Sequence, residues 1–145
     1  MEIERKFLVT KIPPLQDLKF HEITQAYISI TPEIRVRSKG EKYYRTEKGE
    51  GAMIREEIEY EISKEEYEKG VELCKGRLIE KTRYYIPDSP YIIELDIYHG
   101  KHEGLVVCEI EFDTEENANA YTPKEWFGKE ITHDVSFRNK ILASR

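Results

Sequence analysis

The sequence lacks the features that mark three common classes of protein. It contains no run of 18 consecutive apolar residues and no charged segment followed by an apolar one at its start, so we expect a soluble, cytoplasmic protein with no membrane contact. Its only two cysteines, Cys74 and Cys108, lack metal-ligand spacing and are expected to be reduced, buried thiols. The net charge of −6 disfavours nucleic-acid binding, which requires a basic surface.

The composition indicates a folded, charge-rich chain. Charged residues make up 36% of the 145 positions and hydrophobic residues 39%. Ten tyrosines and many β-branched residues within short runs argue against disorder. The length predicts a single domain over 1–145.

Alternation of polar and apolar residues predicts mainly β-structure. The expected strands are 2–9, 21–31, 34–38, 42–48, 55–62, 77–86, 91–98 and 105–112. Most are joined by short turns and are therefore expected to be antiparallel. About eight such strands suit a closed barrel, which leaves no exposed sheet edge.

Helix signals are fewer. Ser63 and Glu66 form a capping box for a helix over 63–75, which Gly76 ends. Further helices are predicted over 114–121, from 122 onward, and over 136–143, with a short helical turn at 15–20. The predicted fold class is therefore α+β: an eight-stranded antiparallel barrel with a few helices packed outside.

The first strand carries its charges at every second residue. Glu2, Glu4 and Lys6 share one face, and Ile3 and Phe7 share the other. A single strand of this kind is ordinarily a half-buried strand that shows its charged face to water. The other strands repeat the pattern with these sets: Arg35, Arg37 and Lys39; Tyr44, Thr46 and Lys48; Glu57, Glu59 and Glu61; Lys81, Arg83 and Tyr85; Glu94 and Asp96; Glu109 and Glu111.

These charges are sorted by sign from strand to strand. A solvated face would mix signs, because like charges opposite one another destabilise a sheet. We therefore predict a barrel that is charged and hydrated within and apolar outside. Carboxylate ligands suit Mg²⁺ or Mn²⁺ rather than Zn²⁺. The best candidate metal ligands are Glu2, Glu4, Glu109 and Glu111.

Several motifs in order resemble the CYTH superfamily, also called the triphosphate tunnel metalloenzymes. The opening Glu2-Ile3-Glu4-Arg5-Lys6 matches the ExExK signature of that family. The likeness continues through Arg35-Val36-Arg37, Thr46-Glu47-Lys48-Gly49, Arg55-Glu56-Glu57-Ile58-Glu59, Lys81-Thr82-Arg83-Tyr84, Glu94-Leu95-Asp96 and Glu109-Ile110-Glu111-Phe112. ExExK alone is a weak pattern, whereas the ordered set covers nearly the whole chain.

The resemblance implies a charged tunnel, a divalent metal and a linear triphosphate substrate. The compact length and the opening run are most similar to short tripolyphosphatase members, so the leading hypothesis is hydrolysis of inorganic tripolyphosphate to pyrophosphate and phosphate. Alternatives within the family are a class IV adenylate cyclase and a thiamine or nucleoside triphosphatase. An alternative of another class is a triphosphate-binding module without turnover. The oligomeric state stays open, with a homodimer as one option.

The resemblance also implies residue roles. The predicted substrate contacts are Lys6, Arg35, Arg37, Lys48, Arg55, Lys81 and Arg83. Lys6, Tyr27 and Lys81 are the candidate catalytic residues, with the alternative that Tyr27 is only a wall aromatic with a hydrogen-bonded hydroxyl. Glu57, Glu59, Glu94 and Asp96 either bind metal or hold the arginines in place.

The chain departs from the family pattern near its end. Members often carry Thr-x-Asp-x-Arg-Tyr-x-Asn, and this chain has Ser136 and Phe137 at the Arg and Tyr positions of that run. The guanidinium and the phenol hydroxyl are therefore absent from this segment, and the resemblance does not fix its role.

Overall fold

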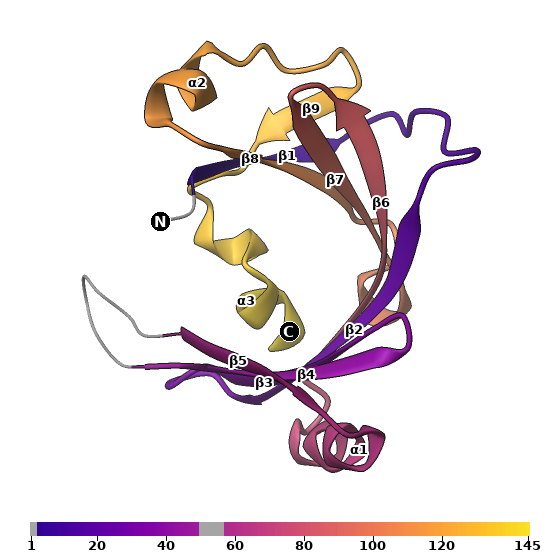
Figure 1. Ribbon diagram of the computed structural model, residues 1–145, viewed down its shortest axis with the longest axis vertical. Helices are drawn as coiled ribbons and strands as arrows, with labels where there is room; N and C mark the ends of the chain where they lie inside the picture. Colours follow the sequence, from indigo (N-terminus) through magenta and orange to yellow (C-terminus); the bar gives the residue numbers. More distant parts are fainter. Residues whose placement is uncertain (1–2, 50–56) are drawn as a thin grey trace. The chain divides into compact units, whose positions relative to one another are not determined.

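The computed structural model describes residues 3–49 and 57–145 and has an α+β fold (Figure 1). Nine strands form one sheet in the order β5-β4-β3-β2-β6-β7-β8-β1-β9. The strands are β1 Ile3–Val9, β2 Phe20–Ser29, β3 Ile34–Lys39, β4 Lys42–Lys48, β5 Glu57–Ile62, β6 Leu78–Asp88, β7 Tyr91–Tyr98, β8 Val106–Phe112 and β9 Phe127–Glu130. The helices are α1 Lys64–Leu73, α2 Glu115–Ala120 and α3 Asn139–Ala143, with short 3₁₀ turns at Gly100–His102 and Val135–Phe137.

The ninth strand corrects the sequence-based expectation of eight. The segment from 122 onward was predicted to be helical, yet β9 forms there and pairs with β1 through Val9↔Phe127 and Phe7↔Glu130. Phe127 packs against Phe7, with ring centroids 4.8 Å apart. This long-range packing outweighs the local helix signals. Because β5 and β9 end the strand order, hydrogen bonding does not close the sheet within the described residues.

The chain forms two compact units. Unit 1 comprises Met1–His21 and Thr82–Asp134, and unit 2 comprises Glu22–Lys81 and Val135–Arg145. Each unit has a core of its own, described separately below. The single domain over 1–145 stays a prediction.

The core of unit 1 lies between the apolar faces of β1, β7 and β8 and the segment α2–β9. Its buried members are Phe7, Ile93, Leu95, Cys108, Ile110, Phe112, Ala118 and Phe127. Helix α2 lies over β1 and β8 (Figure 1). Its start is fixed by Thr114, whose hydroxyl accepts a hydrogen bond from the Asn117 amide, as the sequence predicted. Tyr121 and Trp126 also pack against this core.

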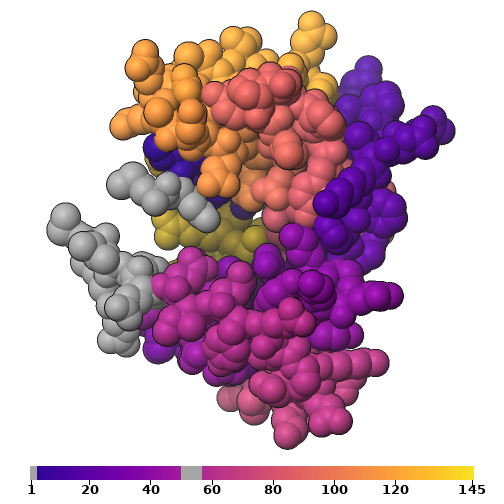
Figure 2. Space-filling view, in the orientation of Figure 1, coloured from indigo at the N-terminus to yellow at the C-terminus, as the bar shows by residue number. Residues whose placement is uncertain are grey.

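The core of unit 2 lies between strands β2 to β5 and helix α1. Its buried members include Ala26, Val36, Ile62 and Cys74. Ser63 caps α1 by accepting a hydrogen bond from the Glu66 amide at 3.1 Å, which confirms the predicted start. Helix α1 contacts β3 and β4, and in the space-filling view its atoms lie at the lower edge next to strands of its own unit (Figure 2).

Other boundaries differ modestly from expectation. Within residues 15–20 there is only a turn at residues 16–17, and Phe20 already begins β2. Strand β6 continues through Pro87 to Asp88 instead of ending at 86. The predicted last helix over 136–143 is divided into a 3₁₀ turn and the shorter α3.

Two further observations concern the length of the helices and the state of the cysteines. No helix among residues 3–49 and 57–145 is long and apolar enough to cross a membrane. Cys74 and Cys108 are both free and buried, as predicted.

Candidate active site

Strands β1, β7 and β8 of unit 1 bring acidic side chains onto one face. Cross-strand partners point to the same side of a sheet, and the register pairs Glu4 with Glu111, Lys6 with Glu109, and Glu109 with Glu94. Asp96 follows Glu94 at strand spacing. We call this set the acidic face: Glu4, Lys6, Glu94, Asp96, Glu109 and Glu111. The pattern predicted in the sequence is therefore present within this unit.

Arg83 on β6 organises one end of the acidic face. Its Nε and Nη2 donate to the two oxygens of Asp96 at 2.7 and 2.9 Å, and its Nη1 donates to Glu94 at 3.2 Å. Nη2 also lies 3.6 Å from Glu109. Burial by itself lowers the pKa of Arg83, but the Asp96 hydrogen bonds and the neighbouring carboxylates outweigh burial and raise that pKa. Arg83, predicted to contact substrate, thus already holds three carboxylates.

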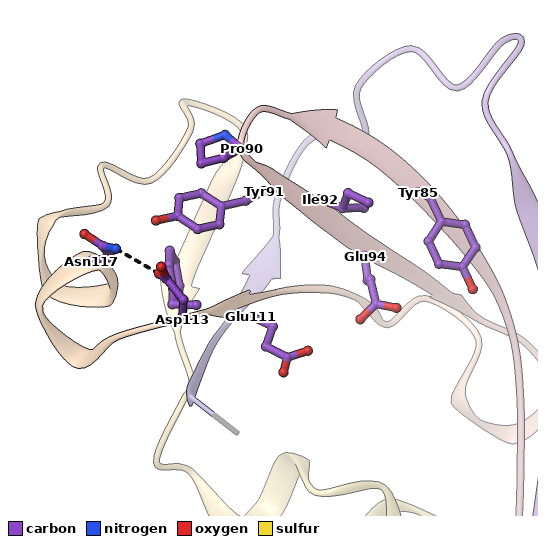
Figure 3. Close-up of a pocket in the computed structure, with 9 residues that line it drawn as sticks. Tyr85, Pro90, Tyr91, Ile92, Glu94, Glu111, Asp113 and Asn117 are labelled. Atoms are coloured by element: carbon purple, nitrogen blue, oxygen red, sulfur yellow. Dashed lines mark hydrogen bonds between the residues drawn. The ribbon is translucent and has the colours of Figure 1, made fainter. Parts of the chain in front are cut away.

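Glu4 and Glu111 are the acidic-face carboxylates farthest from these contacts, and both are exposed. Glu111 and Glu94 project from β8 and β7 to the same side of the strands (Figure 3). Both line a cavity of about 660 Å³ that Tyr85 and Ile92 also border. No group of three His, Cys, Asp or Glu side chains is already gathered around one point among residues 3–49 and 57–145. Glu2, the fourth predicted ligand, lies outside the described residues.

Backbone contacts fix Lys6 in the centre of β1. The Lys6 amide donates to the Thr132 hydroxyl at 3.0 Å, and the Ile131 amide donates to the Lys6 carbonyl at 2.8 Å. The neighbouring Arg5 points to the opposite face, where its guanidinium donates to the Ala118 and Tyr121 carbonyls and to Glu130. The alternation within ExExK thus places Lys6 and Arg5 in different environments.

Strands β3 and β4 of unit 2 carry the cationic side chains. Arg35 lies opposite Thr46 and Arg37 opposite Tyr44. Lys48 lies two residues beyond Thr46 and opposite Glu57 of β5. We call Arg35, Arg37 and Lys48 the basic face. Arg55, also predicted to contact substrate, lies outside the described residues.

Each arginine of the basic face has a carboxylate partner. Arg35 Nη1 donates to Glu33 at 2.7 Å, and Arg37 Nη2 lies 3.6 Å from Glu59. Glu59 also accepts a hydrogen bond from the Thr46 hydroxyl at 2.8 Å. This geometry supports the arginine-holding alternative for Glu59.

Tyr27 and Lys81 are both deeply buried in unit 2. Tyr27 is 1% exposed, and its hydroxyl accepts a hydrogen bond from the Gln25 amide at 3.3 Å. Burial is the main reason that the pKa of Tyr27 is raised to about 12, and Arg35 opposes that rise. The phenol is therefore protonated at neutral pH, which favours a structural role over proton abstraction. Lys81 is 2% exposed.

Sequence reasoning did not identify Glu33 or Thr132. Glu33 has the same parity as Arg35 and Arg37, so the alternation that revealed the arginines could also have found it. Thr132 contacts Lys6 across 126 positions of sequence, and no local pattern points to it.

Two histidines of unit 1 contact hydroxyl groups. His99 lies 2.7 Å from the Thr82 hydroxyl, and His21 lies 3.0 Å from the Tyr85 hydroxyl. His99 is exposed in the turn that follows β7. The Tyr85 contact of His21 had no signal in the sequence.

The chain is similar over nearly its whole length to curated proteins named inorganic triphosphatase. It is 40% identical over 150 aligned residues to one from Nitrosomonas europaea, covering 98% of this chain and 96% of that protein. It is 37% identical over 145 residues to one from Acetivibrio thermocellus, covering 97% and 92%. A crystal structure of an inorganic triphosphatase superposes with a TM-score of 0.83 and 36% identity, covering 100% of this chain and 95% of that one. No family model matches the chain.

Proposed function

Because this chain belongs to the inorganic triphosphatase family, we propose that it hydrolyses inorganic tripolyphosphate to pyrophosphate and phosphate. We place it within the CYTH superfamily on its ordered motifs. The observation that carries the proposal is the sorting of charge: carboxylates gather on β1, β7 and β8, and cations gather on β3 and β4. As the motif resemblance implies, we further propose that the fold is a tunnel with a charged interior.

The basic face has the chemistry to hold the substrate. The guanidinium groups of Arg35 and Arg37 match phosphate oxygens in two-point geometry, and Lys48 adds a point charge. Lys6 and Lys81 complete the proposed set of cations within the described chain. Their charge stabilises the negative charge that develops on the phosphoryl oxygens during cleavage.

The acidic face fits a divalent metal by the chemistry of its donors. Glu4 and Glu111 lie opposite each other, and Glu109 lies two residues from Glu111. Oxygen-only ligands of this kind select Mg²⁺ or Mn²⁺. With Glu2, these residues would hold the ion, which supplies charge neutralisation and a more acidic bound water. We propose that Arg83 and Asp96 keep the acidic side chains in position, with Glu94 shared between the two roles.

The reaction consumes one water and breaks one terminal phosphoanhydride bond. The water oxygen bonds to the terminal phosphorus, and the bridging oxygen leaves with pyrophosphate. The chain's own residues hold the phosphates in line for this displacement. Because the Tyr27 phenol is buried and protonated, we assign it to the wall of the site rather than to proton transfer.

A substrate panel tests the proposal. Purified protein with Mg²⁺ is given tripolyphosphate, ATP or thiamine triphosphate, and phosphate, pyrophosphate and cyclic AMP are measured. We expect the highest kcat/KM for tripolyphosphate, with phosphate and pyrophosphate released in equal amounts. Cyclic AMP as the main product, preference for an organic triphosphate, or binding without turnover would each contradict the proposal.

A further inference from the structure

We infer that Glu33 is a positioning residue for the phosphate-binding side chains, which holds the Arg35 guanidinium and the Lys48 ammonium side by side. This inference rests on the proposed function, because it assigns Glu33 to the binding of that same triphosphate.

Glu33 occupies the turn that leads into β3. Its carbonyl accepts a hydrogen bond from the Lys48 amide at 2.9 Å, so the β3–β4 pairing extends one residue past Ile34. This register sets Glu33 directly opposite Lys48 and two residues from Arg35. All three side chains therefore leave the sheet on one face.

The Glu33 carboxylate contacts both cations. Its Oε2 accepts from Arg35 Nη1 at 2.7 Å and lies 3.5 Å from Lys48 Nζ. The side chain of Glu33 is only 6% exposed, whereas those of Arg35 and Lys48 are 17% and 29% exposed. A buried carboxylate carries a desolvation cost, which its two partners offset. Glu33 therefore lies beneath the cations, and the cations are the more accessible groups.

The contact leaves donor capacity on Arg35. A guanidinium has five N–H donors in a rigid fork, and Glu33 engages Nη1. The Nε of Arg35 is buried and makes no hydrogen bond within the described part of the chain. Glu33 thus holds the guanidinium through Nη1 and does not use its other N–H donors.

Glu59 provides a contrast on the same sheet. Its side chain is 39% exposed, it lies 3.6 Å from Arg37, and it shares its carboxylate with Thr46. The shorter and more buried contact of Glu33 makes it the stronger constraint on its arginine. It also bridges to a second cation, which would otherwise be repelled by the first.

Two conservative variants of Glu33 distinguish its role in positioning the cations from its role in balancing their charge. Glu33→Gln keeps the length of the side chain and an oxygen acceptor but removes the charge. Glu33→Asp keeps the charge but withdraws the carboxylate by one methylene. Glu47→Gln is the matched control, because Glu47 is next to Lys48 on β4 and contacts Arg45 on the opposite face, at 3.7 Å.

The experiment measures the Kd of tripolyphosphate by calorimetry in EDTA, and KM and kcat with Mg²⁺. We expect Glu33→Asp to raise Kd and KM about tenfold, since small displacements of binding groups are costly. We expect Glu33→Gln to stay within about threefold of the wild type, and kcat to change less than about threefold in both variants. Glu47→Gln should match the wild type throughout.

Normal binding by Glu33→Asp, or a defect in Glu33→Gln as large as that in Glu33→Asp, would overturn the inference. The proposed function fails separately: a wild-type protein that binds tripolyphosphate without cleaving it contradicts hydrolysis, while the calorimetric series still decides the role of Glu33. A wild-type protein that does not bind tripolyphosphate contradicts both.

Discussion

Three arginines on the charged strand faces, Arg35, Arg37 and Arg83, contact specific carboxylates, and these contacts differ in number and geometry. The guanidinium of Arg83 contacts three carboxylates, those of Asp96, Glu94 and Glu109. Arg35 Nη1 lies 2.7 Å from Glu33, and Arg37 Nη2 lies 3.6 Å from the more exposed Glu59. We expect Arg35 and Arg37 to carry more of the phosphate binding than Arg83, because Arg83 bridges three carboxylates of the acidic face.

Glu4→Gln is the residue-scale prediction for the metal ligands. Gln keeps the shape of this exposed side chain but removes the negative charge that a hard cation requires. We expect kcat/KM for tripolyphosphate to fall by at least about 100-fold, equivalent to about 2.7 kcal/mol of transition-state stabilisation. The melting temperature should stay within about 2 °C of the wild type, since exposed substitutions rarely change stability much.

Glu103→Gln is the control for that variant, because Glu103 is an exposed glutamate in the turn before β8. It should retain wild-type kcat/KM. Near-normal turnover by Glu4→Gln would remove Glu4 from the metal site.

At the scale of elements, helix α1 packs against β3 through a glycine. An alanine ordinarily stabilises a helix interior by about 1 kcal/mol relative to glycine. A Cβ on Gly70, however, would lie 2.6 and 2.9 Å from the two methyl carbons of Val36. We predict that Gly70→Ala destabilises the protein by about 1–3 kcal/mol, because overpacking outweighs helix propensity. Urea unfolding measures this change.

Lys69→Ala is the control, because it introduces alanine at the preceding, exposed position of α1, where only helix propensity changes. It should change the free energy of unfolding by less than about 0.5 kcal/mol. A Gly70→Ala protein more stable than the wild type would show that α1 does not pack tightly against Val36.

Strands β1 and β9 are joined to α2 by Arg5, and this junction makes stability depend on pH. Arg5 donates to Glu130 at 2.8 and 3.0 Å, and this hydrogen bond is the main reason that the pKa of Glu130 is lowered. A lowered carboxyl pKa adds stability above the unfolded-state value of about 4.3 and loses it as pH falls through the folded-state value. We predict that Glu130→Gln melts below the wild type at pH 7.

That difference in melting temperature should shrink as the pH falls from 5 to 3, because Glu130 then becomes protonated in the wild type as well. Thermal melts of both proteins at pH 7, 5 and 3 provide the measurement. If the difference in melting temperature stays constant over this pH range, the charge of Glu130 does not contribute to stability at the junction.

The sequence predicts those elements whose signals are local. Alternation located β7 at 91–98, and side-chain hydroxyls marked the starts of α1 and α2 at Ser63 and Thr114. Residues 122–130 were misread, because Pro123 and Glu125 indicate a helix while the burial of Phe127 against Phe7 decides the outcome. The competing contact lies far away in sequence, so no local rule reveals it.

The candidate site also has features that local sequence patterns predict and features that depend on long-range contacts. Parity predicted that Glu4, Glu94, Glu109 and Glu111 lie on the charged faces of their own strands, and the register of the structure makes Glu4–Glu111 and Glu94–Glu109 cross-strand partners. Parity could not tell which carboxylate each arginine engages. That choice depends on side-chain reach and on the register between strands.

For the whole molecule, the negative net charge conflicts with the proposed binding of a negatively charged substrate. A chain with a net charge of −6 is expected to repel a polyanion. Under the proposed function, the sorting of charge by strand resolves this conflict, because the basic face is assigned to the phosphates and the acidic face to a divalent cation. Turnover should therefore depend on a divalent metal.

The most direct test of this account is phosphate release from tripolyphosphate before and after removal of divalent metal. Activity is measured with Mg²⁺, then with excess EDTA, then after Mg²⁺ or Mn²⁺ is restored. The account predicts that release stops in EDTA and returns when either ion is added. Hydrolysis that continues undiminished in EDTA would contradict it.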